Sequence, residues 1–223
     1  MEIEEKYYNM RFDLPLKKEL WSDMEEQMAQ LLLTYYNEKY GSLKCIDRPD
    51  LQNPDKSLGI EVANMKTETE CYVEGNIATY LNPLINNEKR EKARKTLNRA
   101  GISTEYEGVI TTTMCYRDRV DGIISTYNKK LIKLPEYKEK GFNKIGLFLF
   151  CEKPPINPFS ENIISILKET FKKHDFDIIF INTANHLIVL NEKKNLVDEI
   201  TINKNDYTAL FCKARHIIDE QSS

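Results

Sequence analysis

The sequence predicts an α/β fold with a mixed central sheet flanked by helices. Three observations support this prediction. Segments with strand character alternate with segments of helical periodicity along most of the chain. The run 145–150 is continuously apolar apart from one glycine, which is typical of a strand buried on both faces. The 223 residues are 41% hydrophobic and 30% charged, a balance that supports a packed core and excludes general disorder. We find no internal repeat or linker and expect a single domain over residues 1–223, with a helical insertion at about 66–107.

The first helix is expected over about 15–40, with Gly41 at its end. Its apolar residues recur at intervals of three and four and form one stripe. The stripe consists of Trp21, Met24, Met28, Leu31, Leu32 and Tyr35. A polar, turn-rich segment over 48–56 follows, and residues 58–63 then indicate a short buried strand.

The insertion contains a charged helix, Asn87–Arg99, which Gly101 closes. Beyond it, the β-branched segment Gly108–Tyr116 indicates a strand. Apolar spacing then predicts a helix over Asp118–Leu134, ended by Pro135.

The remaining elements follow in quick succession. Lys144–Cys151 is the clearest strand, and Ser160–Lys172 has the pattern of an amphipathic helix capped by Ser160. The last predicted elements are strands at Phe176–Ile181, His186–Asn191 and Leu196–Ile202, and a short helix at Thr208–Ile218.

Composition excludes several classes of protein. The net charge of −3 does not fit a wholly basic nucleic-acid coat protein, although a local patch can still bind nucleic acid. No apolar run reaches the roughly 18 residues of a membrane helix, so we expect no membrane partner. The acidic start of the chain lacks a secretory signal, which favours a cytoplasmic protein with its five cysteines reduced. The sequence shows no zinc-ligand spacing among its three histidines, no Gly-rich phosphate loop and no GxSxG motif.

Two carboxylates stand out. Asp50 follows Pro49 in a predicted turn, and Glu61 lies eleven residues later in a strand that is otherwise apolar. Because side chains alternate along a strand, Glu61 points away from the face of Ile60 and Val62. At a semi-buried position it needs a cation or a hydrogen-bond donor. Paired carboxylates suit a hard divalent ion, Mg2+ or Mn2+, whereas a turn-capping Asp50 and a structural Glu61 would need no ion.

These residues resemble the PD-(D/E)xK nuclease superfamily, which includes restriction enzymes and archaeal Holliday junction resolvases. The motifs are Pro49-Asp50 and Glu61-Val62-Ala63. In particular, the chain is similar to uncharacterised bacterial members with a DRPDF…GIEVT pattern, followed by a Lys-rich helix, a Tyr and an apolar strand, here 128–137 and 145–150. The order of elements over roughly 15–190 also resembles that family. The resemblance implies a restriction endonuclease-like fold and a metal held by Asp50, Glu61 and the Val62 carbonyl.

One position departs from the family pattern, because Ala63 stands where the catalytic lysine is expected. In some branches of the superfamily this lysine has moved to the following helix. Lys130 lies about 60° from Tyr127 on that helix, at the edge of the apolar stripe, whereas Lys129 and Lys133 are expected to point away. Lys66 is a second candidate for this role, and Lys130 could instead only extend along the rim of the core.

The first helix of the superfamily often supplies a further glutamate. With Met28 as reference, Glu25 lies about 60° away and within reach of the apolar face. Glu26 lies about 160° away, toward solvent, and Glu38 about 80° away near the helix end. Glu25 is therefore our candidate for assisting catalysis. The alternative is that Glu25 is only a solvated carboxylate at the rim of the helix.

The charged helix supplies a candidate nucleic-acid surface. Its basic residues Lys89, Arg90, Arg94 and Lys95 would suit sequence-independent phosphate contacts, although such a run is also typical of a solvated helix face. Together these observations predict a metal-dependent phosphodiesterase, a nuclease acting on nucleic acid, with DNA favoured over RNA. The rival predictions are an inactive nuclease-like module that binds nucleic acid or a protein partner, and an unrelated α/β protein. The sequence leaves open whether the protein is a homodimer.

Overall fold

The structure is a computed structural model that describes most of the chain. The described residues are 1–13, 16–65, 68–82, 84–99, 116–151, 171, 175–183, 186–191 and 196–222. They fall into two compact units. The first comprises Met1–Met65 and Ile123–Ser223, and the second comprises Lys66–Gly122.

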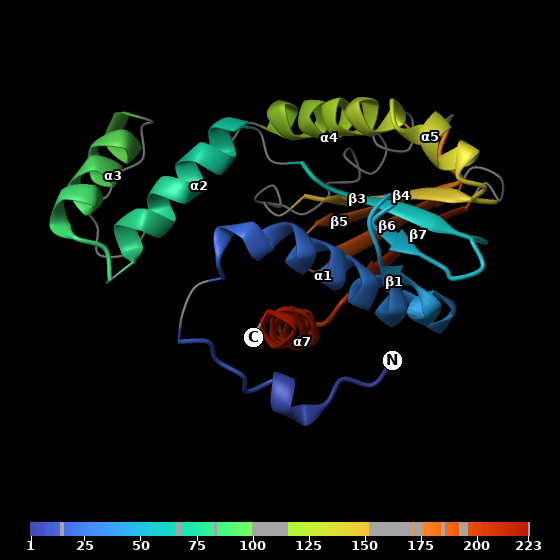
Figure 1. The fold of residues 1–223 in the computed structure, drawn as a ribbon, viewed down its shortest axis with the longest axis horizontal. Helices are drawn as coiled ribbons and strands as arrows, with labels where there is room; N and C mark the ends of the chain where they lie inside the picture. Colours follow the sequence, from blue (N-terminus) through green and yellow to red (C-terminus); the bar gives the residue numbers. More distant parts are fainter. Residues whose placement is uncertain are drawn as a thin grey trace. The chain divides into compact units, whose positions relative to one another are not determined.

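The first unit is built around a seven-stranded sheet whose strands follow one another in chain order, β1 to β7 (Figure 1). The strands are β1 (Lys44–Cys45), β2 (Leu51–Gln52), β3 (Gly59–Asn64), β4 (Ile145–Phe150), β5 (Ile178–Thr183), β6 (His186–Asn191) and β7 (Leu196–Thr201). The central strands β3, β4 and β5 pair in parallel, and the strands on either side pair antiparallel. The prediction of an α/β fold with a mixed sheet and flanking helices is therefore confirmed.

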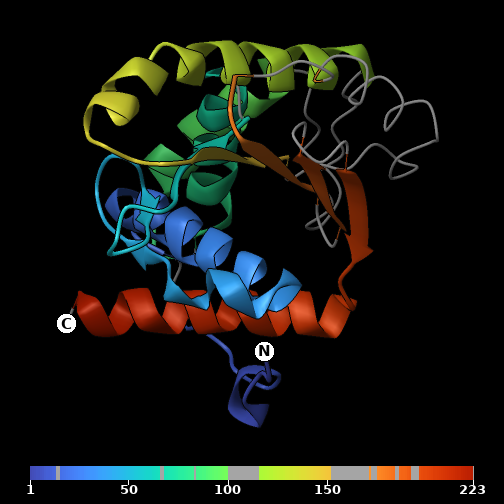
Figure 2. The ribbon, with the colours of Figure 1, turned by 90° about the vertical axis from the view of Figure 1, so that its right-hand side faces the viewer.

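Helices cover both faces of this sheet (Figures 1 and 2). On one face lie α1 (Trp21–Tyr36) and α7 (Lys204–Gln221), which pack against each other. On the other lie the part of α4 (Tyr116–Leu131) that belongs to this unit and α5 (Leu134–Glu139). Short 3-10 helices occur at Glu5–Tyr7, Lys18–Leu20 and Glu38–Ser42.

Alternation along the strands divides the core into two layers. On β3, Ile60 and Val62 pack with α1, whereas Ala63 joins the layer under α4 and α5. Every residue of β4 is buried, as its apolar run predicts. Glu61 therefore points into the layer below α4 and α5, as the alternation predicts.

The first and last helices differ from their predicted bounds. The helix expected over 15–40 is α1, which ends at Tyr36 because Asn37 adopts an extended backbone conformation. The Asn37 side chain accepts a hydrogen bond from the Lys39 amide and starts a 3-10 turn that contains Gly41. At the other end of the chain, α7 is longer than the predicted 208–218, because Asn203 caps it by accepting from the Asn205 amide.

The helix predicted over Asp118–Leu134 ends earlier than expected, and a separate short helix begins at its last residue. α4 ends at Leu131, and α5 begins at Leu134 with Pro135 in its first turn. The prediction that Pro135 ends a helix was wrong, because Pro135 lies in the first turn of α5. A proline has no backbone N–H, but the N–H groups of a first turn have no partner within the helix, and the fixed φ of proline suits that position.

In the second unit, α2 (Glu68–Leu81) packs against α3 (Asn87–Arg99), whose Ala93 and Leu97 are buried. These helices lie in the region where an insertion was expected. The predicted strand Gly108–Tyr116 lies outside the described residues, except for Tyr116, which begins α4. The predicted helix Ser160–Lys172 also lies outside them, except for Phe171. Within the described ranges, no helix combines the length and apolar character needed to cross a membrane.

Candidate functional site

The loop before β2 carries Asp50 and is held against β3. A Cβ atom at Gly59 would lie 2.5 Å from Cγ of Pro49, so only glycine allows the proline ring to approach β3 this closely. The Gln52 side-chain amide also secures the loop, because it donates to the backbone carbonyls of Ile46, Asp47 and Pro49.

Asp50 lies beside the part of β3 that has no pairing with β2. The short strand β2 pairs only with Gly59 and Ile60, so β3 extends beyond its partner. There the Val62 amide donates to Asp50 Oδ2 at 2.7 Å. Burial raises the pKa of Asp50, and the nearby charge of Glu61 raises it further. Among the described residues, none donates a hydrogen bond to Asp50 Oδ1.

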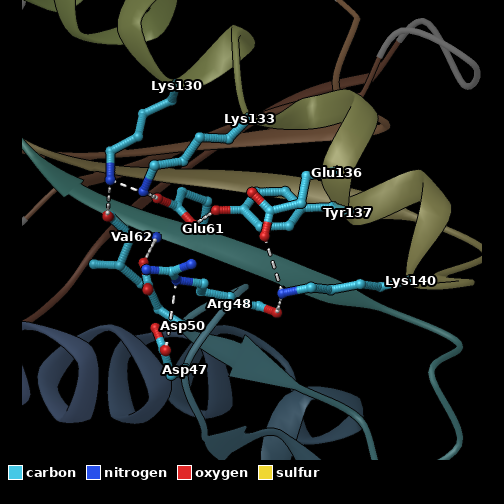
Figure 3. Close-up of polar contacts among 10 residues, drawn as sticks. All are labelled: Asp47, Arg48, Asp50, Glu61, Val62, Lys130, Lys133, Glu136, Tyr137 and Lys140. Atoms are coloured by element: carbon cyan, nitrogen blue, oxygen red, sulfur yellow. Dashed lines mark hydrogen bonds and ion pairs between the residues drawn. The ribbon is translucent and has the colours of Figure 1, made fainter.

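Glu61 is the buried carboxylate of the site, with 1% of the residue exposed. Its Oε1 accepts from Lys130 at 2.5 Å and from Lys133 at 3.0 Å, and its Oε2 accepts from the Tyr137 hydroxyl (Figure 3). Burial alone would raise the pKa of Glu61, but the hydrogen bonds from Lys130, Tyr137 and Lys133 bring it below its ordinary value. The carboxylate is therefore ionised at neutral pH.

Lys130 connects two of the predicted metal ligands. Its Nζ atom lies 2.5 Å from Glu61 Oε1 and 3.2 Å from the Val62 carbonyl oxygen. Figure 3 shows the side chain reaching down from α4 to β3, between these two oxygens. The structure thus brings together Asp50, Glu61, Val62 and Lys130, which lie up to 80 residues apart in the sequence.

Two members of the cluster, Lys133 and Tyr137, were not predicted from the sequence. Lys133 was expected to point away, but its ammonium group lies 3.0 Å from Glu61 Oε1. A residue three positions after Lys130 lies only about 60° from it around a helix, so both side chains reach the same carboxylate. Its contact with Glu61 raises the pKa of Lys133, although burial opposes this. Tyr137, fully buried, projects from α5. The spacing of Lys130, Lys133 and Tyr137, at three and four residues, is the signal that could have found both, because residues at these intervals share one face of a helix.

The candidate glutamates of α1 have different surroundings. Glu25 Oε1 accepts from the side-chain amide of Asn64, at the end of β3, at 2.8 Å. Glu26 was expected to face solvent, but it is half-buried. Burial together with the charge of Asp50 raises the pKa of Glu26 to about 7.

Glu38 and Lys66 do not contribute to the cluster as the structure describes it. Glu38 is 86% exposed and pairs with the chain's N-terminal amine at 3.5 Å. Lys66, the second candidate for the role of Lys130, lies outside the described residues.

The basic helix α3 belongs to the second unit. Lys89 and Lys95 are exposed. Arg90 is partly buried and donates to the carbonyls of Asn82 and Ile85, so it holds the turn between α2 and α3. Arg94 pairs with Glu91 at 2.8 Å. Of the four predicted phosphate-binding residues, the two lysines are the most accessible.

The donor set of the site fits a hard cation. Asp50 Oδ1, Glu61 Oε1 and the Val62 carbonyl are oxygens of the kind that Mg2+ and Mn2+ prefer. Within the described ranges, no three His, Cys, Asp or Glu side chains form a metal-binding group. Lys130 already occupies two of these three oxygens.

A separate cavity of about 350 Å³ lies at the amino ends of β4 and β5. It is lined by Lys39, Tyr40, Asn53, Ser57, Leu58, Lys144, Asp177, Ile178 and Asn191. None of the residues around Glu61 contributes to it, and we place the candidate chemistry at Glu61 because charged groups converge there.

No protein-family model, curated protein or solved structure matches this chain. The fold itself defines an α/β protein with a seven-stranded mixed sheet. A charged cluster lies between β3 and the chain around the end of α4 and the start of α5.

Proposed function

We propose that this protein is a metal-dependent phosphodiesterase of the PD-(D/E)xK type, with a restriction endonuclease-like fold, that cleaves nucleic acid, with DNA favoured. One observation carries the proposal. Two carboxylates, a backbone carbonyl and a lysine from three separate segments meet at the edge of β3. This combination supplies hard metal ligands beside a cation, which is what phosphodiester hydrolysis requires.

Each residue has a role in this proposal. Asp50, Glu61 and the Val62 carbonyl would hold Mg2+, and the bound ion would supply charge neutralisation and an activated water. Lys130 stabilises charge on the attacked phosphate in place of the lysine that Ala63 replaces. Glu25, which lies beside Asn64, orients water near the end of β3.

The test is calorimetric titration of the protein with Mn2+, compared with Asp50→Asn and Glu61→Gln. Both substitutions keep the side-chain shape and remove a charge, so each should weaken Mn2+ binding about tenfold or more. Glu38→Gln removes an equally charged but exposed carboxylate and should leave the affinity unchanged. Equal Mn2+ affinity in the wild type and both site variants would refute the assignment.

Cleavage is then measured on supercoiled DNA, linear duplex DNA and single-stranded RNA of matched length. We expect Mn2+- or Mg2+-dependent cleavage that EDTA abolishes and that Glu61→Gln lowers at least a hundredfold. Cleavage in EDTA at the full rate would contradict the proposal.

A specific observation favours a second candidate, a nuclease-like module that binds nucleic acid without cleaving it. Two lysines and a tyrosine already satisfy Glu61, so the cluster can stand without a metal ion. If this second function is correct, the affinity for DNA is the same in Mg2+ and in EDTA, and the protein does not bind Mn2+. The same titration separates the two functions.

A further inference from the structure

The position of Lys130 has a consequence for metal binding. Its ammonium group lies on Glu61 Oε1 and on the Val62 carbonyl oxygen, two of the three oxygens assigned to the metal. The side chain is only 22% exposed, so the ammonium group is held within the site rather than in solvent. The lysine ammonium group therefore contacts two of the oxygens that the proposed function assigns to the cation.

Glu61 cannot easily present a different oxygen. Tyr137 is fully buried and donates to Oε2, which fixes the orientation of the carboxylate. Oε1 is the oxygen that faces the lysines, and it already accepts two ammonium groups. A metal ion must compete for this atom.

The two lysines are not equivalent in that competition. Lys130 contacts both Glu61 and Val62, whereas Lys133 contacts Glu61 alone among the described residues, at 3.0 Å, and has 47% of its side chain exposed. Lys133 can move toward solvent and still lie near the site. Lys130 must leave both oxygens before a divalent ion can take them, because two cations cannot share these positions.

We propose that Lys130 and the metal ion exchange at this site. In the metal-free protein, the ammonium group of Lys130 neutralises Glu61 and takes the Val62 carbonyl. Metal binding displaces it and leaves a cation next to the metal, where it can bind the phosphate that is attacked. This inference rests on the proposed function, and it makes Lys130 a regulator of metal affinity as well as a catalytic residue.

The first experiment compares the Mn2+ affinities of the wild type, Lys130→Met and Lys133→Met by calorimetry at pH 8. Both variants lose one positive charge near Glu61, so their long-range effects on Mn2+ binding are matched. Exchange predicts that Lys130→Met binds Mn2+ about tenfold more tightly than the wild type, and clearly more tightly than Lys133→Met. Lys129→Met, at an exposed position, should leave the affinity unchanged.

The second experiment uses the wild-type protein and does not depend on the folding of any variant. Lysines are acetylated for a short time with and without Mn2+, and the modification of each is read by mass spectrometry. Displacement predicts that Mn2+ increases the acetylation of Lys130 several-fold and leaves that of Lys129 unchanged.

The outcomes separate the inference from the proposed function. If the wild type binds Mn2+ and Lys130→Met binds it with equal or lower affinity, the exchange is overturned and the metal site stands. The same holds if the acetylation of Lys130 does not rise with Mn2+. Absence of Mn2+ binding in both the wild type and Lys130→Met overturns both.

Discussion

At the scale of single residues, Glu61 shows how a charge can be buried in the middle of a sheet. An isolated carboxylate at this depth would be protonated, because burial disfavours its charged form. Three donors, Lys130, Lys133 and Tyr137, reverse this and hold the pKa of Glu61 below its ordinary value. The carboxylate is thus kept ionised by groups that a divalent ion could replace in part.

Glu26 provides a prediction about pH. Burial, followed by the charge of Asp50, raises its pKa from 4.5 to about 7. Between these values the folded protein holds a proton that the unfolded chain has lost, so the free energy of unfolding falls as pH rises from about 4.5 to 7. Glu26→Gln removes this dependence. Relative to the wild type, the variant should gain on the order of 1 kcal/mol between pH 5 and pH 8, a value reduced for solvent screening at a half-buried position.

Urea unfolding in EDTA at pH 5 and pH 8 measures this difference. Glu38→Gln is the control, because its carboxylate is 86% exposed and should show the wild-type dependence. If Glu26→Gln and the wild type lose stability in parallel between the two pH values, Glu26 does not hold the proton.

At the scale of elements, the sequence predicts periodicity better than it predicts breaks. The stripe of α1 and the buried run of β4 were found because burial imposes a regular spacing on the residues. The same periodicity placed Lys130 near the core side of its helix, and the structure brings it to Glu61. The alternation around Glu61 likewise predicted which face of the sheet it occupies.

The orientations of Lys133 and Glu26 were predicted wrongly. With Tyr127 as the reference, Lys133 lies about 120° away and was assigned to solvent, although it lies only about 60° from Lys130, which contacts the same carboxylate. Glu26 is half-buried on α1, which contacts β1, and the charge of Asp50 acts on it there. Tertiary contacts of this kind leave no local pattern in the helix itself.

The close packing of Pro49 on Gly59 leads to a prediction at the same scale. Gly59→Ala would place a Cβ atom 2.5 Å from Pro49 and 3.0 Å from Phe142, so the loop that carries Asp50 must shift. We expect a loss of about 1–3 kcal/mol in the free energy of unfolding, the usual effect of overpacking, and weaker Mn2+ binding. Urea unfolding and calorimetry measure the two effects.

Gly41→Ala is the matched control, since its Cβ would lie at an ordinary 3.5 Å from Thr34. Its stability should stay within about 0.5 kcal/mol of the wild type. A Gly59→Ala variant as stable as Gly41→Ala would show that the loop is free to move away from β3.

At the scale of the whole molecule, charge is unevenly distributed along the chain. The net charge is −3, yet α3 in the second unit carries six basic and two acidic residues. Contacts within the unit occupy two of its predicted phosphate-binding residues, Arg90 and Arg94. Lys89 and Lys95 are exposed and remain the best candidates for binding a nucleic-acid backbone.

The last prediction concerns these two lysines. If each neutralises one DNA phosphate, the double variant Lys89→Gln/Lys95→Gln should weaken duplex binding for all sequences alike. Because each contact releases counterions, the slope of log K against log salt concentration should become shallower by about two. Fluorescence anisotropy of a labelled duplex between about 50 and 200 mM NaCl gives this slope.

The control, Lys17→Gln/Lys204→Gln, makes the same change in net charge at exposed positions of the first unit. It should alter the slope little. Equal slopes in the two double variants would show that α3 is an ordinary solvated helix, because a general change in net charge would then explain the whole effect.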